Sequence, residues 1–174
     1  RLTIASSCLD LNLFYFNKLF YHLSMLYLAT DHAGFELKEV LKVYLTELGY
    51  AVEDLGTYSS QACDYPDFII PAAQKVALDP EGNRAIVLGG SGQGEAIAAN
   101  KVKGIRAVVY NSHNLEIIRL SRDHNNANVL ALGARFLTPE QAKEAVKLWL
   151  ETQFSYDERH VRRLNKIRYL EENS

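Results

Sequence analysis

The chain has 174 residues, of which 48% are hydrophobic and 23% are charged, and its formal net charge is -2. This length and apolar content predict one domain with its own core, and the near-neutral charge balance gives no electrostatic reason to expect nucleic acid as a partner. Cys8 and Cys63 lack C-x-x-C spacing. They therefore indicate neither a disulfide framework nor a zinc site, and they are compatible with a reducing compartment such as the cytoplasm.

Residues 1–24 differ in character from the rest, because aromatic and aliphatic side chains mix with charged ones such as Asp10 and Lys18 without a regular period. The uncharged piece 11–17 is far shorter than the roughly 20 apolar residues of a membrane-spanning helix, so no membrane partner is expected. The two charges also interrupt the apolar region that a secretory signal requires. We therefore expect residues 1–24 to be an extension outside the core fold, either a misplaced start or a weak targeting leader, and 25–174 to form a single domain.

From Met25 onward, hydrophobic periodicity predicts strands that alternate with helices. In chain order the expected elements are strand 26–30, helix 35–48, strand 51–55, helix 65–78, strand 85–88, helix 95–102, strand 106–110, helix 113–123, strand 127–132 and helix 139–152. Thr138 as N-cap and Pro139 as first helical residue begin the last of these. Five strands separated by helices indicate an α/β fold with a parallel sheet covered on both faces.

A final helix is expected over 156–171, where the sequence is amphipathic and highly charged. No strand follows it, so it has no sheet face left to cover. We expect this C-terminal helix to pack on a partner subunit.

The segment 87–101, VLGGSGQGEAIAANK, leads from an apolar strand through four glycines directly into a helix. Such glycines let successive N–H groups point at one anion, which the positive end of the helix dipole also favours. The third glycine position of a dinucleotide fingerprint falls on Glu95, and Gly94 is not followed by the lysine of a P-loop. Nucleotide binding is therefore disfavoured.

Ser91 and Glu95 accompany these amide donors. A carboxylate beside a group of hydrogen-bond donors is suited to removing a proton from carbon while the donors stabilise the resulting oxyanion. A tight strand-to-helix turn would also use glycines, but four within six residues exceed what packing alone needs.

Polar residues follow other predicted strands, and ligands of parallel α/β sheets bind at the carboxyl ends of strands. Asp31 and His32 follow the first strand, Asn111 and Ser112 the fourth, and Arg135 the fifth. Position after a strand favours a role in binding or catalysis. The alternatives are that Asp31 caps the next helix and that His32 is an ordinary loop residue.

Two further groups of polar residues have structural alternatives. His124 and Asn125 end the helix before the fifth strand, where both residue types are also common as helix terminators. Arg159 and Arg163 share one helix face, which would either clamp a phosphate or form a solvated basic surface. The pattern alone slightly favours the solvated surface.

Six motifs together strongly resemble the type B ribose-5-phosphate isomerases, in the superfamily that includes galactose-6-phosphate isomerase subunits. They are DHAG at 31–34, DYP at 64–66, GGSGQGE at 89–95, IAANK at 97–101, HNNAN at 124–128 and RHVRR at 159–163. The resemblance extends over about 25–173. It implies a Rossmann-like three-layer α/β fold with a five-stranded parallel sheet, and a homodimer or dimer of dimers with active sites shared between subunits. It also implies a phosphorylated sugar as ligand, with neither metal nor organic cofactor.

The resemblance also implies chemical roles for individual residues. Glu95 would be the base that moves a proton between C2 and C1 of the open-chain sugar phosphate, Asp31 would relay protons between the two substrate oxygens, and His124 would assist ring opening. The enediolate oxygen would be held by Ser91 and by the loop at Gly90, Gly92, Gln93 and Gly94.

Substrate-binding roles follow in the same way. Asn125 would bind sugar hydroxyls. For the two arginines, the resemblance implies phosphate binding in place of a solvated basic surface. The phosphate would be held by His32, Arg135, Arg159 and Arg163, the last two from the neighbouring subunit.

The chain departs from many members of that family in its base. Those members place a cysteine where this chain has Gly89, a threonine at the position of Ser91 and an apolar residue at that of Glu95. This chain resembles the glutamate branch, and Cys63 does not align with the catalytic cysteine.

The implied function is interconversion of ribose 5-phosphate and ribulose 5-phosphate through a cis-enediolate, a step of the pentose phosphate pathway. One alternative is isomerisation of a six-carbon aldose phosphate, such as allose 6-phosphate or galactose 6-phosphate. Another is a non-catalytic sugar-phosphate sensor, against which the joint presence of Ser91, Glu95 and Asp31 argues, because a binding module does not use a carbon base.

Overall fold

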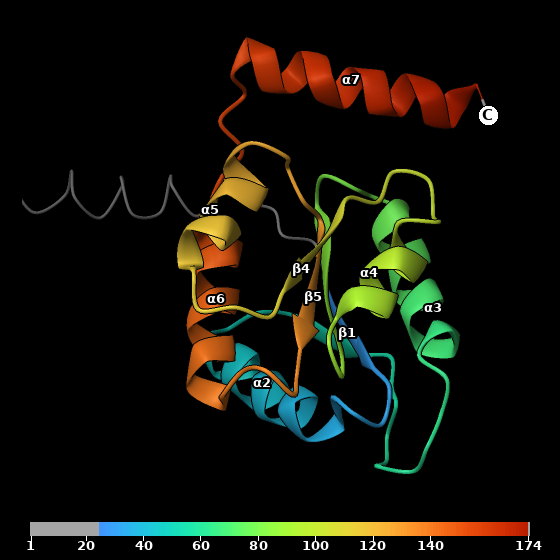
Figure 1. Cartoon of the computed structure of the whole chain (residues 1–174), viewed down its shortest axis with the longest axis vertical. Helices are drawn as coiled ribbons and strands as arrows, with labels where there is room; N and C mark the ends of the chain where they lie inside the picture. The colour runs from blue at the N-terminus through green and yellow to red at the C-terminus, as the bar shows by residue number, and fades with distance from the viewer. Residues whose placement is uncertain (1–24, 174) are drawn as a thin grey trace, which may run out of the picture.

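A computed structural model describes residues 25–173, and the predicted extension 1–24 lies outside the described residues. Five strands alternate with five helices in this part of the chain, and a sixth helix follows at its end (Figure 1). They are β1 (Met25–Thr30), α2 (Phe35–Glu47), β2 (Val52–Asp54), α3 (Pro66–Ala77), β3 (Asn83–Gly89), α4 (Gln93–Ala99), β4 (Ala107–Tyr110), α5 (Leu115–Asp123), β5 (Val129–Gly133), α6 (Pro139–Glu151) and α7 (Glu158–Glu172).

Every element predicted between 25 and 173 is present in its predicted order. The ends differ by a few residues, most at α4, which was expected to reach 102 but ends at Ala99. The reason is that Lys101 and Val102 donate to the carbonyls three residues earlier, at 3.1 and 3.0 Å, so the chain tightens into turns there. Thr138 caps α6 as predicted, and its side chain accepts a hydrogen bond from the Gln141 N–H.

The strands form one parallel sheet in the order β2-β1-β3-β5-β4. Successive side chains of a strand point to opposite faces, and each face is covered by its own helices. Leu26 and Leu28 of β1 belong to the apolar core shared with α2, α5 and α6. Tyr27 and Ala29 belong to a second core shared with α3 and α4, which gives the expected three layers (Figure 1).

The sheet contains a topological switch point between β1 and β3. The chain leaves β1 into α2, on one face of the sheet, and leaves β3 into α4, on the other face. Ligands of open α/β sheets bind in the crevice that opens outside the carboxyl ends of two such strands. The topology therefore makes the place where residues 31–34 and 90–95 meet the candidate binding site.

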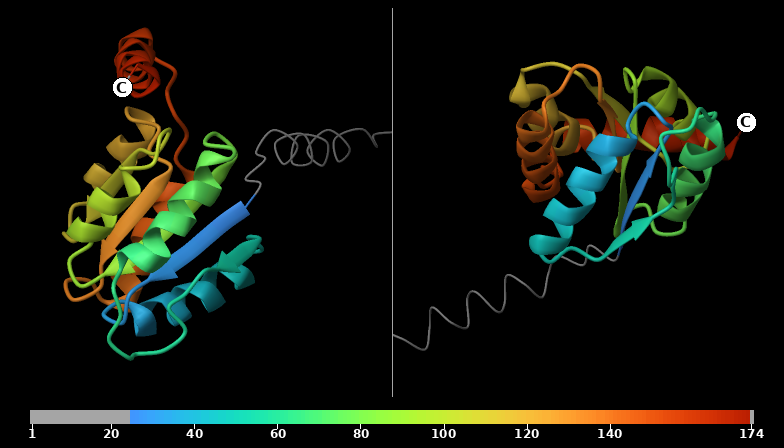
Figure 2. Two further views of the ribbon diagram at one scale, coloured as in Figure 1. Left: turned by 90° about the vertical axis from the view of Figure 1, so that its right-hand side faces the viewer. Right: turned by 90° about the horizontal axis from the view of Figure 1, so that it is seen from below.

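The C-terminal helix α7 stands apart from both helical layers (Figure 2). Only His160 among its residues is buried, while Ile167, Tyr169 and Leu170 are 50%, 69% and 67% exposed. Near its end, Glu171 Oε2 accepts a hydrogen bond from the Gly104 N–H at 3.1 Å, just before β4 begins. The helix therefore lies across the amino ends of the strands and covers no face of the sheet, as predicted. None of the helices within 25–173 has the length and apolar character needed to cross a bilayer.

Candidate active site

The glycine loop between β3 and α4 is shaped by close packing against β5. Gly92 is the N-cap of α4 and has a φ of 80°, a left-handed conformation that glycine adopts freely. A Cβ at this position would also lie 3.1 Å from the Ala131 carbonyl oxygen. Ser91 Oγ accepts a hydrogen bond from the Gln93 N–H at 3.3 Å, which leaves its own hydroxyl hydrogen free to point at a ligand.

Glu95 lies in the first turn of α4 and is only 4% exposed. Its carboxylate packs against the backbone of Gly89, where a larger residue would meet it. Burial raises the pKa of the Glu95 carboxyl group, and the nearby negative charge of Asp31 raises it further, although the Glu95 N–H opposes both. A carboxylate with a raised pKa is a stronger base than one in water, as proton abstraction from carbon requires.

Asp31 and His32 follow β1, as predicted, and Asp31 lies close enough to Glu95 for its charge to act on that carboxyl group. Asp31 is 8% exposed, and its Oδ1 accepts a hydrogen bond from the Ala33 N–H at 2.9 Å. The alternative that Asp31 caps the next helix is wrong, because the N-cap of α2 is Gly34. His32 Nδ1 lies 3.3 Å from the carbonyl oxygen and 3.4 Å from the amide nitrogen of Cys63, which fixes the ring against the loop that follows β2.

Arg135 follows β5 and lies over the glycine loop. Its backbone N–H donates to the Gly90 carbonyl oxygen at 3.1 Å, and a Cβ on Gly90 would lie 3.3 to 3.5 Å from atoms of the guanidinium group. The side chain is exposed, so its charge is available to an anion held by the loop. Asn111, after β4, donates from Nδ2 to the Ser91 carbonyl oxygen at 3.1 Å and thereby holds the loop from its other side.

Tyr65 also reaches this site, although it was not among the residues predicted to belong to it. A Cβ on Gly94 would lie 2.9 Å from Tyr65 Cζ and 3.1 Å from its hydroxyl oxygen, so the phenol group rests on the first turn of α4. The sequence signal for Tyr65 was the DYP motif at 64–66, which is one of the motifs shared with the family. Tyr65 does not directly follow a strand, so the search for polar residues at strand ends does not find it. We call Asp31, His32, residues 90–95, Arg135 and Tyr65 the carboxyl-end cluster.

The remaining predicted residues gather elsewhere, in a group that we call the amino-end cluster: His124, Asn125, Arg159 and Arg163. His124 is the C-cap of α5, and its ring stacks on that of His160 at 4.2 Å between centroids and 16° between planes. Asn125, Arg159 and Arg163 are exposed. This arrangement ties the start of α7 to the end of α5.

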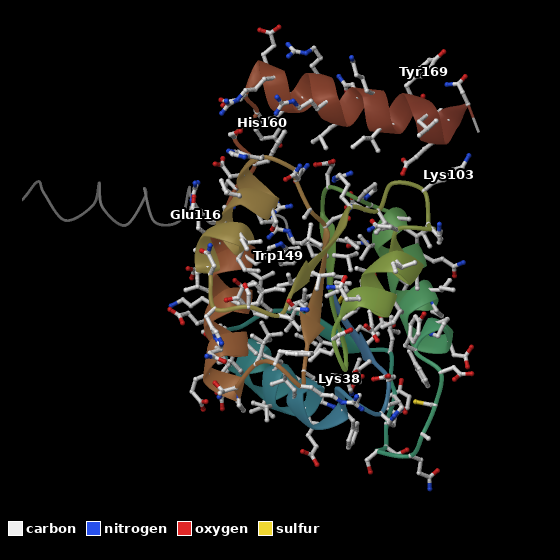
Figure 3. All side chains as sticks on the ribbon, in the orientation of Figure 1. Lys38, Lys103, Glu116, Trp149, His160 and Tyr169 are labelled. Atoms are coloured by element: carbon white, nitrogen blue, oxygen red, sulfur yellow. The ribbon has the colours of Figure 1, made fainter. Side chains whose placement is uncertain are left out.

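The two clusters lie at opposite ends of the sheet. The helix α5 runs back against the direction of the strands, so its C-terminal residue His124 lies before β5, whereas Glu95 follows the carboxyl end of β3. A seven-residue strand such as β3 spans about 20 Å. In Figure 3, His160 lies at one end of the molecule, and Lys38, in the first turn of the helix that follows β1, lies at the other end. A single chain therefore does not bring His124, Asn125, Arg159 and Arg163 to Glu95.

Comparison with known proteins agrees with this fold. The family model for ribose/galactose isomerases matches residues 26–167. Ribose-5-phosphate isomerase B of Mycolicibacterium paratuberculosis is 43% identical over 140 residues, which are 80% of this chain and 86% of that protein. The Escherichia coli protein of the same name is 42% identical over 142 residues, covering 82% and 93%.

Two solved structures resemble the whole domain. Ribose-5-phosphate isomerase B of Clostridium thermocellum superposes with a TM-score of 0.80 at 40% identity, covering 86% of this chain and 98% of that one. The Mycoplasma genitalium enzyme with bound ribulose-5-phosphate superposes with a TM-score of 0.82 at 36% identity, covering 86% and 97%. The chain belongs to the ribose/galactose isomerase family.

Proposed function

We propose that this protein is an aldose-ketose isomerase that interconverts ribose 5-phosphate and ribulose 5-phosphate. The observation that carries the proposal is the buried Glu95 carboxylate, with its raised pKa, beside a glycine loop of amide donors and Asp31. Relatives at about 40% identity are named for this reaction, and one of them was solved with ribulose-5-phosphate bound.

The chemistry is a proton transfer between neighbouring carbons. Glu95 removes the C2 proton of the open-chain aldose, and the electron pair shifts to give an enediolate whose oxygen is held by Ser91 and the loop amides. Glu95 then returns the proton to C1 as the C2 carbonyl forms. Asp31 carries the accompanying proton between the two oxygens, so that O1 gains one and O2 loses one.

Phosphate binding uses arginine and histidine side chains at both ends of the sheet. His32 follows the same strand end as Asp31, and Arg135 lies against the glycine loop, where it presents a planar, permanently charged fork that suits phosphate oxygens. Arg159 and Arg163, four apart on α7, would supply two more. Their position at the amino end supports a site completed by a second chain.

We therefore propose a symmetric dimer in which the amino-end cluster of one chain meets the carboxyl-end cluster of the other. This brings His124, for ring opening, and Asn125, for the sugar hydroxyls, to the Glu95 of the partner. The exposed Ile167, Tyr169 and Leu170 of α7 are the apolar residues expected to become buried on association.

The experiment that tests the function is conversion of ribose 5-phosphate by the full chain without added metal, compared with Glu95→Gln. The amide keeps the shape but cannot accept the proton, so turnover is expected to fall at least about 1000-fold while binding of a sugar phosphate persists. Glu116→Gln is the matched control, because Glu116 also lies in the first turn of a helix but is exposed and paired with Arg119. It should retain full activity.

Other outcomes have distinct meanings. Conversion of allose 6-phosphate or galactose 6-phosphate in place of the pentose would assign a six-carbon substrate to the same site. Binding without any turnover by the folded wild-type protein would make it a sensor and reject the isomerase. Loss of both binding and turnover in Glu95→Gln would indicate that Glu95 is structural.

A further inference from the structure

Lys38 carries a fully buried ammonium group on α2, outside the residues assigned to the site. Its side chain is 0% exposed, and Nζ donates to Asp54 Oδ2 at 2.5 Å and to Glu39 Oε1 at 2.6 Å. The aromatic rings of Phe35 and Tyr58 have their centroids 5.7 Å from Nζ. A lysine is almost never fully buried unless it is paired, so this burial is sustained by specific partners.

Asp54, at the end of β2, connects Lys38 to the loop that follows. Its Oδ1 accepts a hydrogen bond from the Gly56 N–H at 3.0 Å, and its carbonyl oxygen accepts one from the Tyr58 hydroxyl at 3.1 Å. Burial by itself would raise the pKa of the Asp54 carboxyl group, but hydrogen bonds from Lys38, Lys42 and the Gly56 N–H lower it. The carboxylate is therefore ionised at neutral pH and holds the start of the loop through a charge-assisted network.

The same loop contacts the carboxyl-end cluster directly. Thr30 donates its N–H to the Gly56 carbonyl oxygen at 2.7 Å and accepts from the Thr57 N–H at 2.8 Å, so the loop clamps the residue before Asp31. Farther along, the backbone of Cys63 holds the His32 ring. The segment 55–65 thus reaches the site at Thr30, at His32 and, through Tyr65, at the glycine loop.

We propose that Lys38 is a positioning residue for isomerisation, which acts through Asp54 on the segment 55–65 and thereby aligns Asp31 and His32. The inference rests on the proposed function of that site. Lys42 reaches the same Asp54 oxygen at 2.7 Å, but its side chain is 34% exposed, so water replaces its contribution. Lys38 has no access to water, and its loss leaves the loop without its buried anchor.

The test compares Lys38→Met with Lys42→Met. Each change removes one ammonium group from Asp54 while keeping a linear apolar side chain. We expect Lys38→Met to lower kcat for ribose 5-phosphate about 10-fold to 100-fold, because small misplacements of catalytic groups are costly, and to raise KM as His32 loses its support. Lys42→Met should stay within about two-fold of wild type for both constants.

Two further measurements separate positioning from a merely structural role. If Lys38 acts through Asp54, then Lys38→Met, Asp54→Asn and the double variant should lower kcat by similar factors, because contributions along one path do not multiply. Unchanged kcat in folded Lys38→Met, with only a lower Tm, would overturn the proposal. Should Lys38→Met not fold, unchanged kcat in Asp54→Asn would do the same.

Amide hydrogen exchange gives a result that does not depend on turnover. Exchange in 55–65 and at Thr30 and Asp31 should accelerate in Lys38→Met and not in Lys42→Met. A wild-type chain without isomerase activity would refute the proposed function. Equal exchange in both variants would refute the coupling of Lys38 to the site.

Discussion

The carboxylate of Glu95 occupies the space that a side chain on residue 89 would need. A Cβ on Gly89 would lie 1.8 Å from Glu95 Oε1 and 2.1 Å from its Cδ. Gly89 ends β3 and pairs with Gly133 in the sheet, so the backbone is held in place and the glutamate side chain would have to move. A base on residue 89, which the resemblance implies for members with a cysteine there, and a base on Glu95 would therefore compete for one position.

Replacing Gly89 by alanine is expected to inactivate the protein while leaving it folded. The added methyl group meets the end of a flexible side chain, so Glu95 rotates away and kcat falls at least about 100-fold. Gly133→Ala is the contrasting variant, because its Cβ would lie 2.8 Å from the Ser91 backbone oxygen and should lower Tm strongly. Steady-state kinetics and thermal melting of the two variants check this, and normal turnover in Gly89→Ala would contradict it.

The acid limb of the activity profile should report the pKa of Glu95. Only the ionised carboxylate acts as base, so activity is lost as pH falls through the folded pKa, which burial and Asp31 raise above the usual value of about 4.3. Asp31→Asn removes the neighbouring negative charge and should move the limb of kcat/KM to lower pH, whatever its effect on the maximum. A limb that stays in place would show that the two carboxylates do not interact.

His160 should titrate below an ordinary histidine and make the protein less stable in acid. Its ring is 3% exposed, and burial, followed by the adjacent His124, lowers its pKa. A lowered folded pKa means that the unfolded chain takes up the proton first, so stability is lost as pH falls below the unfolded value of about 6.5. An NMR titration of the His160 ring gives the pKa directly.

Urea unfolding measures the consequence for stability. Between about pH 7 and pH 5, the free energy of unfolding should fall less in His160→Phe than in the wild-type protein. Phenylalanine keeps a flat ring but cannot take up a proton. An equal slope in both proteins would assign the acid sensitivity to other groups.

Mixing two inactive variants tests whether two chains share each site. Glu95→Gln disables the carboxyl-end cluster and His124→Asn the amino-end cluster, so a mixed dimer contains one site with both changes and one with neither. Random pairing should restore about a quarter of wild-type activity. No recovery after the chains are unfolded together and refolded would show that each chain holds its own complete site.

The order of elements was predictable because each strand and helix carries its own period and end signals. The pairing of Asp31 with Glu95 was also predictable, because both follow strands that a parallel sheet places side by side. The separation of His124 from Glu95 follows from the direction of α5, which runs opposite to the strands. The order of elements in the sequence already implies this direction, but looking only for polar residues near strands overlooks it. His124 precedes its strand, so it belongs to the other end.

Long-range packing accounts for what the sequence did not reveal. Lys38 lies next to Leu37 on a helix whose other core residues are Leu41 and Leu45, and a charged residue there would ordinarily be assigned to the surface. Its burial depends on Asp54, which is distant in sequence and comes from the neighbouring strand. Tyr65 precedes a proline at a helix start, and its contact with Gly94 exists only because α3 and α4 pack side by side.

The placement of His124 and Glu95 at opposite ends of one sheet has a consequence for how the protein works in the cell. In the shared site that we propose, each chain has its own apolar cores, but its Glu95 needs the His124 of a second chain. Under that proposal, activity per chain should depend on protein concentration and should fall on dilution before the fold is lost. On this proposal, a newly synthesised chain is folded but inactive until it associates with a second copy.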